Sequence, residues 1–83
     1  MEYIIVAYRS RNKAIEVFGN LTSSGYRCVL SSTPQSANVG CGLSIRIRPQ
    51  DFDHLREVLS KVASFAGFFR VTNVNGRTIL TSI

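Results

Sequence analysis

Tryptophan is absent from this chain of 83 residues, and cysteine, proline and histidine occur only two, two and one times. Two cysteines are too few for the disulfide framework of a small secreted protein, which usually has about four or more. A single histidine and the lack of a CxxC pair leave no cluster with the ligand spacing of a zinc site, so we expect no metal. No glycine-rich phosphate loop opens a predicted helix, and we expect no bound cofactor.

Long hydrophobic runs are also missing. The apolar run at residues 3–8 is too short and wrongly flanked for a signal peptide or a membrane span. We therefore expect a protein of the reducing cytoplasm, with no membrane partner and with both thiols reduced. A chain of 83 residues with 45% hydrophobic content is expected to form a single domain over residues 1–83.

Acidic residues are scarce, with five Asp and Glu against ten Lys and Arg, which gives a net charge of +5. The basic residues are spread along the chain without a run of adjacent charges. A net positive charge favours anionic partners, but it does not distinguish between nucleic acid, an acidic protein surface and a small anion.

Hydrophobic spacing predicts five strands and two helices. The strands are expected at Tyr3–Tyr8, Arg27–Leu30, Leu43–Arg48, Phe68–Val74 and Arg77–Ile83. The first helix is expected to begin after Ser10 and to end at Gly25, and the second to begin at Pro49 and to end at Gly67. Asn75-Gly76 is typical of a type I′ hairpin turn. This order predicts an α+β fold of the ferredoxin-like β-α-β-β-α-β type with an added C-terminal strand, in which two helices cover one face of an antiparallel sheet.

The third predicted strand alternates strictly between aliphatic and polar side chains, in the order Leu43, Ser44, Ile45, Arg46, Ile47 and Arg48. The aliphatic face must cover the helices, so the polar residues should look out from the uncovered face of the sheet. We expect Arg70 to join this basic face, because Phe69 and Val71 are the better core candidates.

A polar loop of twelve residues, Ser31–Gly42, ends in Gly40-Cys41-Gly42. The flanking glycines leave the Cys41 thiol without bulky neighbours along the chain and let a donor approach closely. A thiol is nucleophilic only as thiolate, which positive charge and backbone N–H groups favour. Cys41 is therefore the candidate reactive residue, and the alternative is that Gly-Cys-Gly is only a turn into a strand. Cys41 shares the helix-facing parity of Leu43, and the glycines allow a departure from it.

Cys28 lies in the second predicted strand, which pairs with the third across the loop. If the two thiols meet, Cys28 resolves a sulfur or selenium atom accepted by Cys41. The alternative is that Cys28 is simply a core residue. His54 is expected on the solvated face of the second helix, where it forms no catalytic pair with a cysteine.

Three motifs together resemble a known family: Thr33-Pro34, then Cys41 to Arg46 as Cys-Gly-Leu-Ser-Ile-Arg, then Pro49-Gln50-Asp51 opening a helix. They are similar to the small bacterial domains described as Se/S carrier-like proteins, over the chain up to about Leu59. The resemblance implies a carrier that accepts a sulfur or selenium atom on Cys41 as a persulfide or perselenide. The carrier passes this atom to a partner enzyme and has no turnover of its own. The chain departs from the family pattern at Gln35 and at residues 38–40.

In that role, Gly40 and Gly42 admit the donor. Arg46 and Arg48 favour the anionic form of the loaded Cys41, and Thr33 belongs to the binding loop. A second hypothesis is a binding or regulatory module that recognises an anionic ligand through the basic sheet face. The third strand offers no aromatic side chain on which RNA bases could stack, which argues against a nucleic acid partner. A third hypothesis is a homodimer formed through the sheet.

Overall fold

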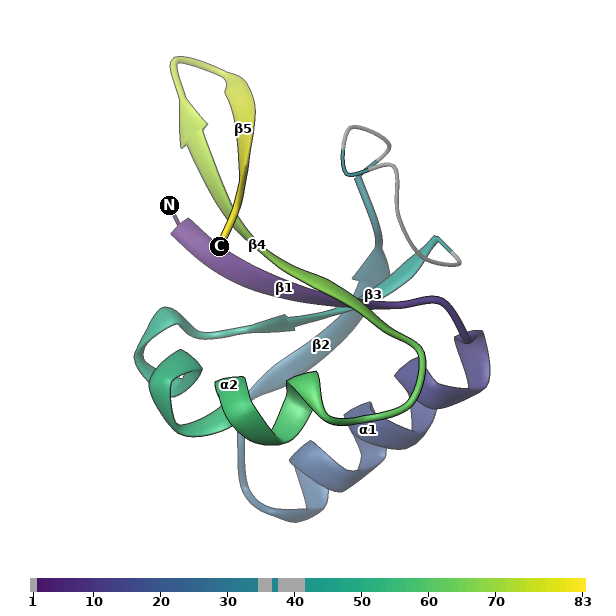
Figure 1. The fold of residues 1–83 in the computed structure, drawn as a ribbon. Helices are drawn as coiled ribbons and strands as arrows, with labels where there is room; N and C mark the ends of the chain where they lie inside the picture. The colour runs from purple at the N-terminus through teal and green to yellow at the C-terminus, as the bar shows by residue number, and fades with distance from the viewer. Residues whose placement is uncertain (1, 35–36, 38–41) are drawn as a thin grey trace.

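The computed structural model describes residues 2–34, 37 and 42–83, which form an α+β fold with a five-stranded sheet and two α-helices (Figure 1). The elements are β1 (Glu2–Tyr8), α1 (Arg11–Ser23), β2 (Cys28–Ser32), β3 (Leu43–Ile47), the short 3₁₀ helix η2 (Pro49–Asp51), α2 (Phe52–Ser60), β4 (Phe65–Val74) and β5 (Arg77–Ser82). The strands lie in the order β2-β3-β1-β4-β5, and each neighbouring pair is antiparallel. The predicted antiparallel sheet with two helices is thus confirmed.

Local sequence signals account for several element ends. The Ser10 side chain accepts a hydrogen bond from the Lys13 N–H at 3.3 Å and caps the start of α1, as predicted. Gly25 follows α1 with a φ of +89°, a left-handed conformation that glycine adopts without strain. Asn75 and Gly76 have φ values of +50° and +79°, so the predicted type I′ turn between β4 and β5 is confirmed.

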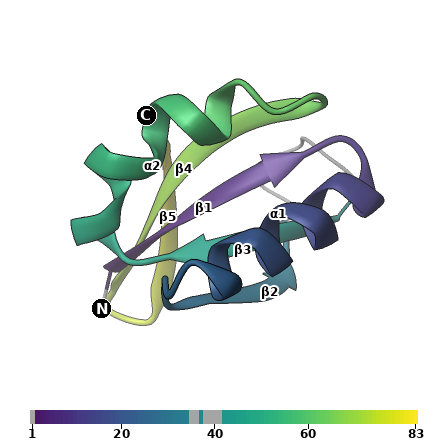
Figure 2. The same cartoon turned by 90° about the horizontal axis from the view of Figure 1, so that it is seen from below.

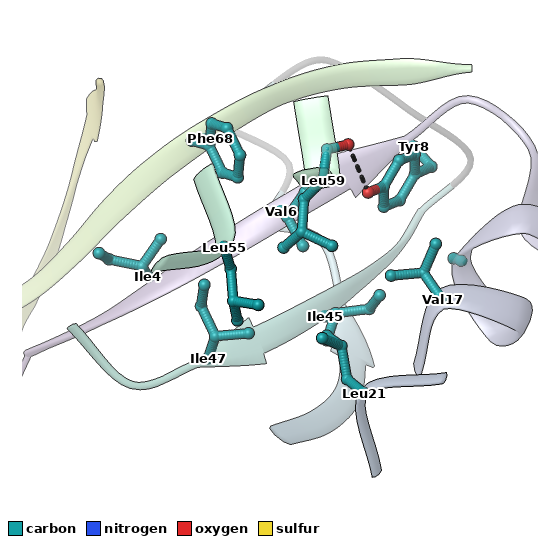
Figure 3. Packing of buried hydrophobic residues seen from close by; sticks show 11 residues of the cluster. Ile4, Val6, Tyr8, Val17, Leu21, Ile45, Ile47, Leu55, Leu59 and Phe68 are labelled. Carbon is teal, nitrogen blue, oxygen red and sulfur yellow. Dashed lines mark hydrogen bonds between the residues drawn. The ribbon is translucent and has the colours of Figure 1, made fainter. Parts of the chain in front are cut away.

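Both helices pack on the same face of the sheet (Figure 2). The core between them combines alternate residues of the strands with one stripe of each helix, namely Ile4, Val6, Tyr8, Ala14, Val17, Leu21, Ile45, Ile47, Leu55, Leu59 and Phe68 (Figure 3). Strand β1 is central in the sheet and pairs with β3 on one side and β4 on the other. Its apolar run is therefore buried on both faces, as the continuous stretch of hydrophobic residues requires.

Tyr8 ends β1 with a phenol group inside this core. Its hydroxyl donates a hydrogen bond of 2.9 Å to the carbonyl oxygen of Leu59, in the last turn of α2 (Figure 3). That carbonyl oxygen also accepts a backbone hydrogen bond of 3.4 Å from the Val62 N–H just past the helix, and the bond from the Tyr8 hydroxyl ties α2 to the sheet. Burial raises the pKa of Tyr8 from its ordinary value of 10.0 to about 12.

We expect the fold to lose stability at alkaline pH through Tyr8. Its folded-state pKa lies above the unfolded one, so its contribution is complete below pH 10.0 and is lost as the pH rises to about 12. The loss amounts to roughly 2–3 kcal/mol of the free energy of unfolding. Denaturant titrations across this pH range measure it. Tyr8→Phe should lower the free energy of unfolding by about 1 kcal/mol at neutral pH, and this free energy should then fall less steeply with pH in the alkaline range. Equal alkaline slopes for the variant and the wild-type protein would contradict the assignment.

The second helix is shorter than predicted. It ends at Ser60, and Ala66 and Gly67, which were expected to continue and terminate it, belong to β4. The change of direction comes at Ser64, which has a φ of +70°. Its carbonyl oxygen accepts a hydrogen bond of 2.7 Å from the Arg9 N–H, and its hydroxyl accepts one from the Ser10 N–H. These bonds favour the turn over another helical turn.

The predicted face of β4 is wrong. Phe68 pairs with Val6, and Arg70 pairs with Ile4, so both lie on the helix-facing side. There Phe68 is buried, and Arg70 forms an ion pair of 3.6 Å with Glu2 at the sheet end. The prediction failed because residues 65–69 include three phenylalanines and no polar residue, so their sequence carries no alternation that fixes a face.

The face away from the helices is largely apolar and buried. Ile5 lies there between Arg46 of β3 and Phe69 of β4 and is 1% exposed. Val71 and Ser44 on the same face are fully buried. Arg46 is therefore the basic residue that the strands place on this side of the sheet, and the broad basic face expected from the sequence does not form among the described residues.

Candidate functional site

The loop between β2 and β3 carries the candidate thiol, and the structure describes its two ends. Thr33 donates its backbone N–H to the Gly42 carbonyl oxygen at 2.9 Å, which extends the hairpin one step beyond the pair Ser32 and Leu43. The residues Gly40 and Cys41 lie outside the described residues. The hairpin therefore closes at the position adjacent to Cys41.

Gly42 has a φ of +87°, which lies in the left-handed region. A Cβ atom built on it would meet no atom within 4 Å among the described residues. The extended backbone of β3 ends at this residue, and the alternation that begins at Leu43 does not continue through it. A glycine is therefore favoured here for its conformation.

Two buried hydroxyl groups lie near the same end of the hairpin. The Thr33 Oγ1 and Ser44 Oγ atoms are inaccessible to solvent and have no hydrogen-bond partner within the described part of the chain. Ser44 pairs with Ser31 in β2 and with Ala7 in β1. A buried hydroxyl without a partner costs free energy, and both of these O–H groups lie at the end of the sheet that carries the loop.

Cys28 lies at the other end of the hairpin. It pairs with Ile47, which is four residues and about 13 Å along β3 from Leu43. The side chain is half-buried and packs against the core, and burial raises the pKa of the Cys28 thiol above its ordinary value. A thiol with a raised pKa stays protonated at neutral pH and is a poor nucleophile.

The arginines assigned to the thiol also gather at the end with Cys28. The Arg46 guanidinium carbon lies 4.0 Å from the centre of the Tyr3 ring. Arg48, just beyond β3, binds the Asp51 carboxylate at 2.9 Å. The predicted site residues thus form two groups, with Thr33 and Gly42 at the loop end and Cys28 with the two arginines at the opposite end.

Asp51 is a residue whose partner the sequence reasoning missed. It belongs to the Pro49-Gln50-Asp51 motif that opens the helix, but its carboxylate makes no side-chain capping bond there. It is nearly buried and pairs with Arg48, three residues before it. The i,i+3 spacing of opposite charges across Pro49 was the signal that could have revealed the pair.

Other kinds of site find no support within residues 2–34, 37 and 42–83. No three His, Cys, Asp or Glu side chains gather there in a way that could hold a metal ion. The helices in these ranges are also too short or too polar to cross a membrane.

Comparison with known proteins gives one finding. A family model described as "Putative Se/S carrier protein-like" matches residues 2–64, which are 63 of the 83 residues. The match spans β1, α1, β2, β3 and α2 and includes both cysteines. No curated protein and no solved structure matches the chain.

Proposed function

The chain belongs to this Se/S carrier family, and we propose that it carries a sulfur or selenium atom on Cys41 from a donor enzyme to an acceptor enzyme. The family match is the observation that carries the proposal, because it covers the whole segment from β1 to α2 around Cys41. A persulfide or perselenide on this thiol is the chemical form of the cargo.

The transfer is a thiol exchange. The Cys41 thiolate attacks the outer sulfur or selenium atom of a persulfide or perselenide on the donor enzyme. The bond between this atom and the donor's cysteine breaks, and the donor leaves as a thiolate. A new bond joins the cargo to Cys41, so no net oxidation occurs and no cofactor is required. Attack by the acceptor's thiolate releases the cargo in the same way.

The loop end suits such an exchange. Gly42 has no side chain, and a Cβ on it would meet no described atom within 4 Å, so we assign to Gly42 and Gly40 the role of admitting the donor's cysteine. We assign the unpartnered Thr33 hydroxyl as a donor of a hydrogen bond to the anionic cargo, because a thiolate or persulfide anion accepts such bonds. Arg46 lies farther along β3 and acts on Cys41 only as a distant positive charge, while Arg48, just beyond β3, is paired with Asp51.

Cys28 is assigned a structural role in this proposal. Its raised pKa and its packing against the core support a thiol that fills space and does not resolve the cargo. Because the carrier thiol must stay reduced, we place the protein in the cytoplasm.

We propose further that the sheet is a ferredoxin-like one with β5 added, and that residues 1–83 form one domain. The order β2-β3-β1-β4, with α1 between β1 and β2 and α2 between β3 and β4, supports the first part. Phe68, which lies beyond the matched residues, packs in the same core as β1, and this supports the second. The homodimer stays a prediction, for which β2 and β5 are the edge strands of the described sheet.

A loading experiment tests the proposed function. Reduced wild-type protein is incubated with a cysteine desulfurase and cysteine, or with a selenium donor, and its intact mass is recorded. We expect a gain of one sulfur or selenium atom that a thiol reductant reverses. A protein whose mass does not change under these conditions would contradict the carrier role.

A further inference from the structure

A hollow of about 500 Å³ opens at the end of the sheet where β1 and β2 begin and β3 ends. Its wall includes Tyr3, Tyr26, Arg27, Arg46 and Arg48, and most of the wall surface is apolar. Hollows of this volume with a few polar groups among apolar walls are typical of small-molecule sites. We call it the arginine pocket.

The charges in the arginine pocket do not cancel. Arg48 is neutralised by Asp51 at 2.9 Å, and the single carboxylate of the wall, Glu2, is paired with Arg70 at 3.6 Å. Arg27 and Arg46 have no acidic partner within the described ranges. Two positive charges therefore remain for an anion from solution.

Arg46 is also held in position for such an anion. Its guanidinium lies over the Tyr3 ring at 4.0 Å, an arrangement that fixes the plane of the group. Its Nε atom is buried and has no hydrogen-bond partner among the described residues. A buried, unpaired N–H of a charged group is costly, and an oxygen anion beside the guanidinium would offset this cost by pairing with its charge.

We propose that the arginine pocket binds a small organic anion with a flat apolar body and a carboxylate or phosphate head. The head accepts hydrogen bonds from the Arg46 fork and is attracted by Arg27, and the apolar body lies against the tyrosines of the wall. A guanidinium fork matches the paired oxygens of carboxylate and of phosphate alike. An inorganic anion has no apolar group that could pack against the apolar wall of the pocket.

This site is distinct from the carrier thiol. The pocket wall includes Cys28 and Ile47, whereas Gly42 lies beyond the other end of β3. Binding in the pocket therefore does not depend on loading at Cys41, and either property can fail while the other holds.

Three probes with the same ring system test the proposal. Wild-type protein is titrated with 2-naphthoate, 2-naphthyl phosphate and neutral 2-naphthamide, and amide chemical shifts are followed by NMR. We expect saturable binding of at least one of the two anions, with shifts centred on Tyr3, Arg27 and Arg46, and binding of the amide at least about tenfold weaker. The stronger of the two anions identifies the head group. No saturable binding, or shifts centred elsewhere, would overturn the proposal.

Arginine variants identify the residue responsible. Arg46→Gln should weaken anion binding about tenfold or more, because a charged hydrogen bond is lost, and Arg46→Lys should restore only part of it. Arg77→Gln on β5 removes the same charge away from the pocket and should change affinity less than about twofold. If Arg46→Gln does not fold, the exposed Arg27→Gln takes its place and should also weaken binding more than Arg77→Gln. Equal affinities for the pocket and control variants would refute the assignment.

Discussion

Replacing Cys41 with serine is expected to abolish loading with sulfur or selenium. A serine hydroxyl stays protonated at neutral pH and does not attack a persulfide as a thiolate does, so the step that joins the cargo to residue 41 is lost. The measurement is intact mass after incubation with the donor enzyme, with the donor in excess and the time course extended well beyond the wild-type half-time. We expect full loading of wild-type protein and none of Cys41→Ser.

Cys28→Ser is the matched control, because it removes the other thiol of the chain with the same change in chemistry. It should load at the wild-type rate, since the raised pKa of Cys28 leaves its thiol protonated at neutral pH. In wild-type protein, an alkylating reagent should modify Cys41 before Cys28 for the same reason. Loading that survives in Cys41→Ser and disappears in Cys28→Ser would reverse the assignment of the two thiols.

Phe68→Ala is expected to cost about 3–5 kcal/mol of unfolding free energy. The Phe68 ring lies 5.0 Å from the Phe52 ring and 4.9 Å from the Phe65 ring, between α2 and the sheet, so truncation leaves a cavity in the core. A chain of this length has a total stability of roughly 4–12 kcal/mol, so the variant should be partly unfolded at moderate temperature.

Phe69→Ala provides the comparison, since it makes the same change one residue later on the opposite face of the sheet, where the Phe69 side chain is only half-buried. Its cost should be less than about half that of Phe68→Ala, because less apolar surface is removed from burial. Denaturant unfolding followed by far-UV circular dichroism measures both, because the chain has no tryptophan to report by fluorescence. A larger cost at Phe69 would mean that β4 faces the helices in the opposite register.

The fold was predictable where short signals are unambiguous. The alternation from Leu43 to Ile47 fixed the faces of β3, and Asn75-Gly76 fixed the hairpin turn. The end of α2 was not predictable, because Val62 and Ala66 continue the helical spacing and only the tertiary bonds of Ser64 with Arg9 and Ser10 select the turn. Such bonds join residues more than fifty positions apart, and no local pattern records them.

The candidate site was predictable only as a segment. The motif around Cys41 pointed to the family, which is confirmed, but Arg46 and Arg48 were assigned to the thiol because they follow it closely in sequence. An extended strand rises about 3.3 Å per residue, so a few positions separate side chains by more than hydrogen-bond reach. The position of Arg46 depends on the Tyr3 ring of β1, a contact between residues far apart in the chain.

The central position of β1 has a consequence for synthesis of the protein on the ribosome. β1 emerges before the other strands of this sheet, and it pairs with residues 44–47 on one edge and with residues 65–72 on the other. Its backbone groups cannot all find their partners until most of the chain has left the exit tunnel, and this separation slows folding relative to chains dominated by local contacts. The nascent apolar run at residues 3–8 is therefore exposed during translation, and it is the segment on which we expect chaperones to act first.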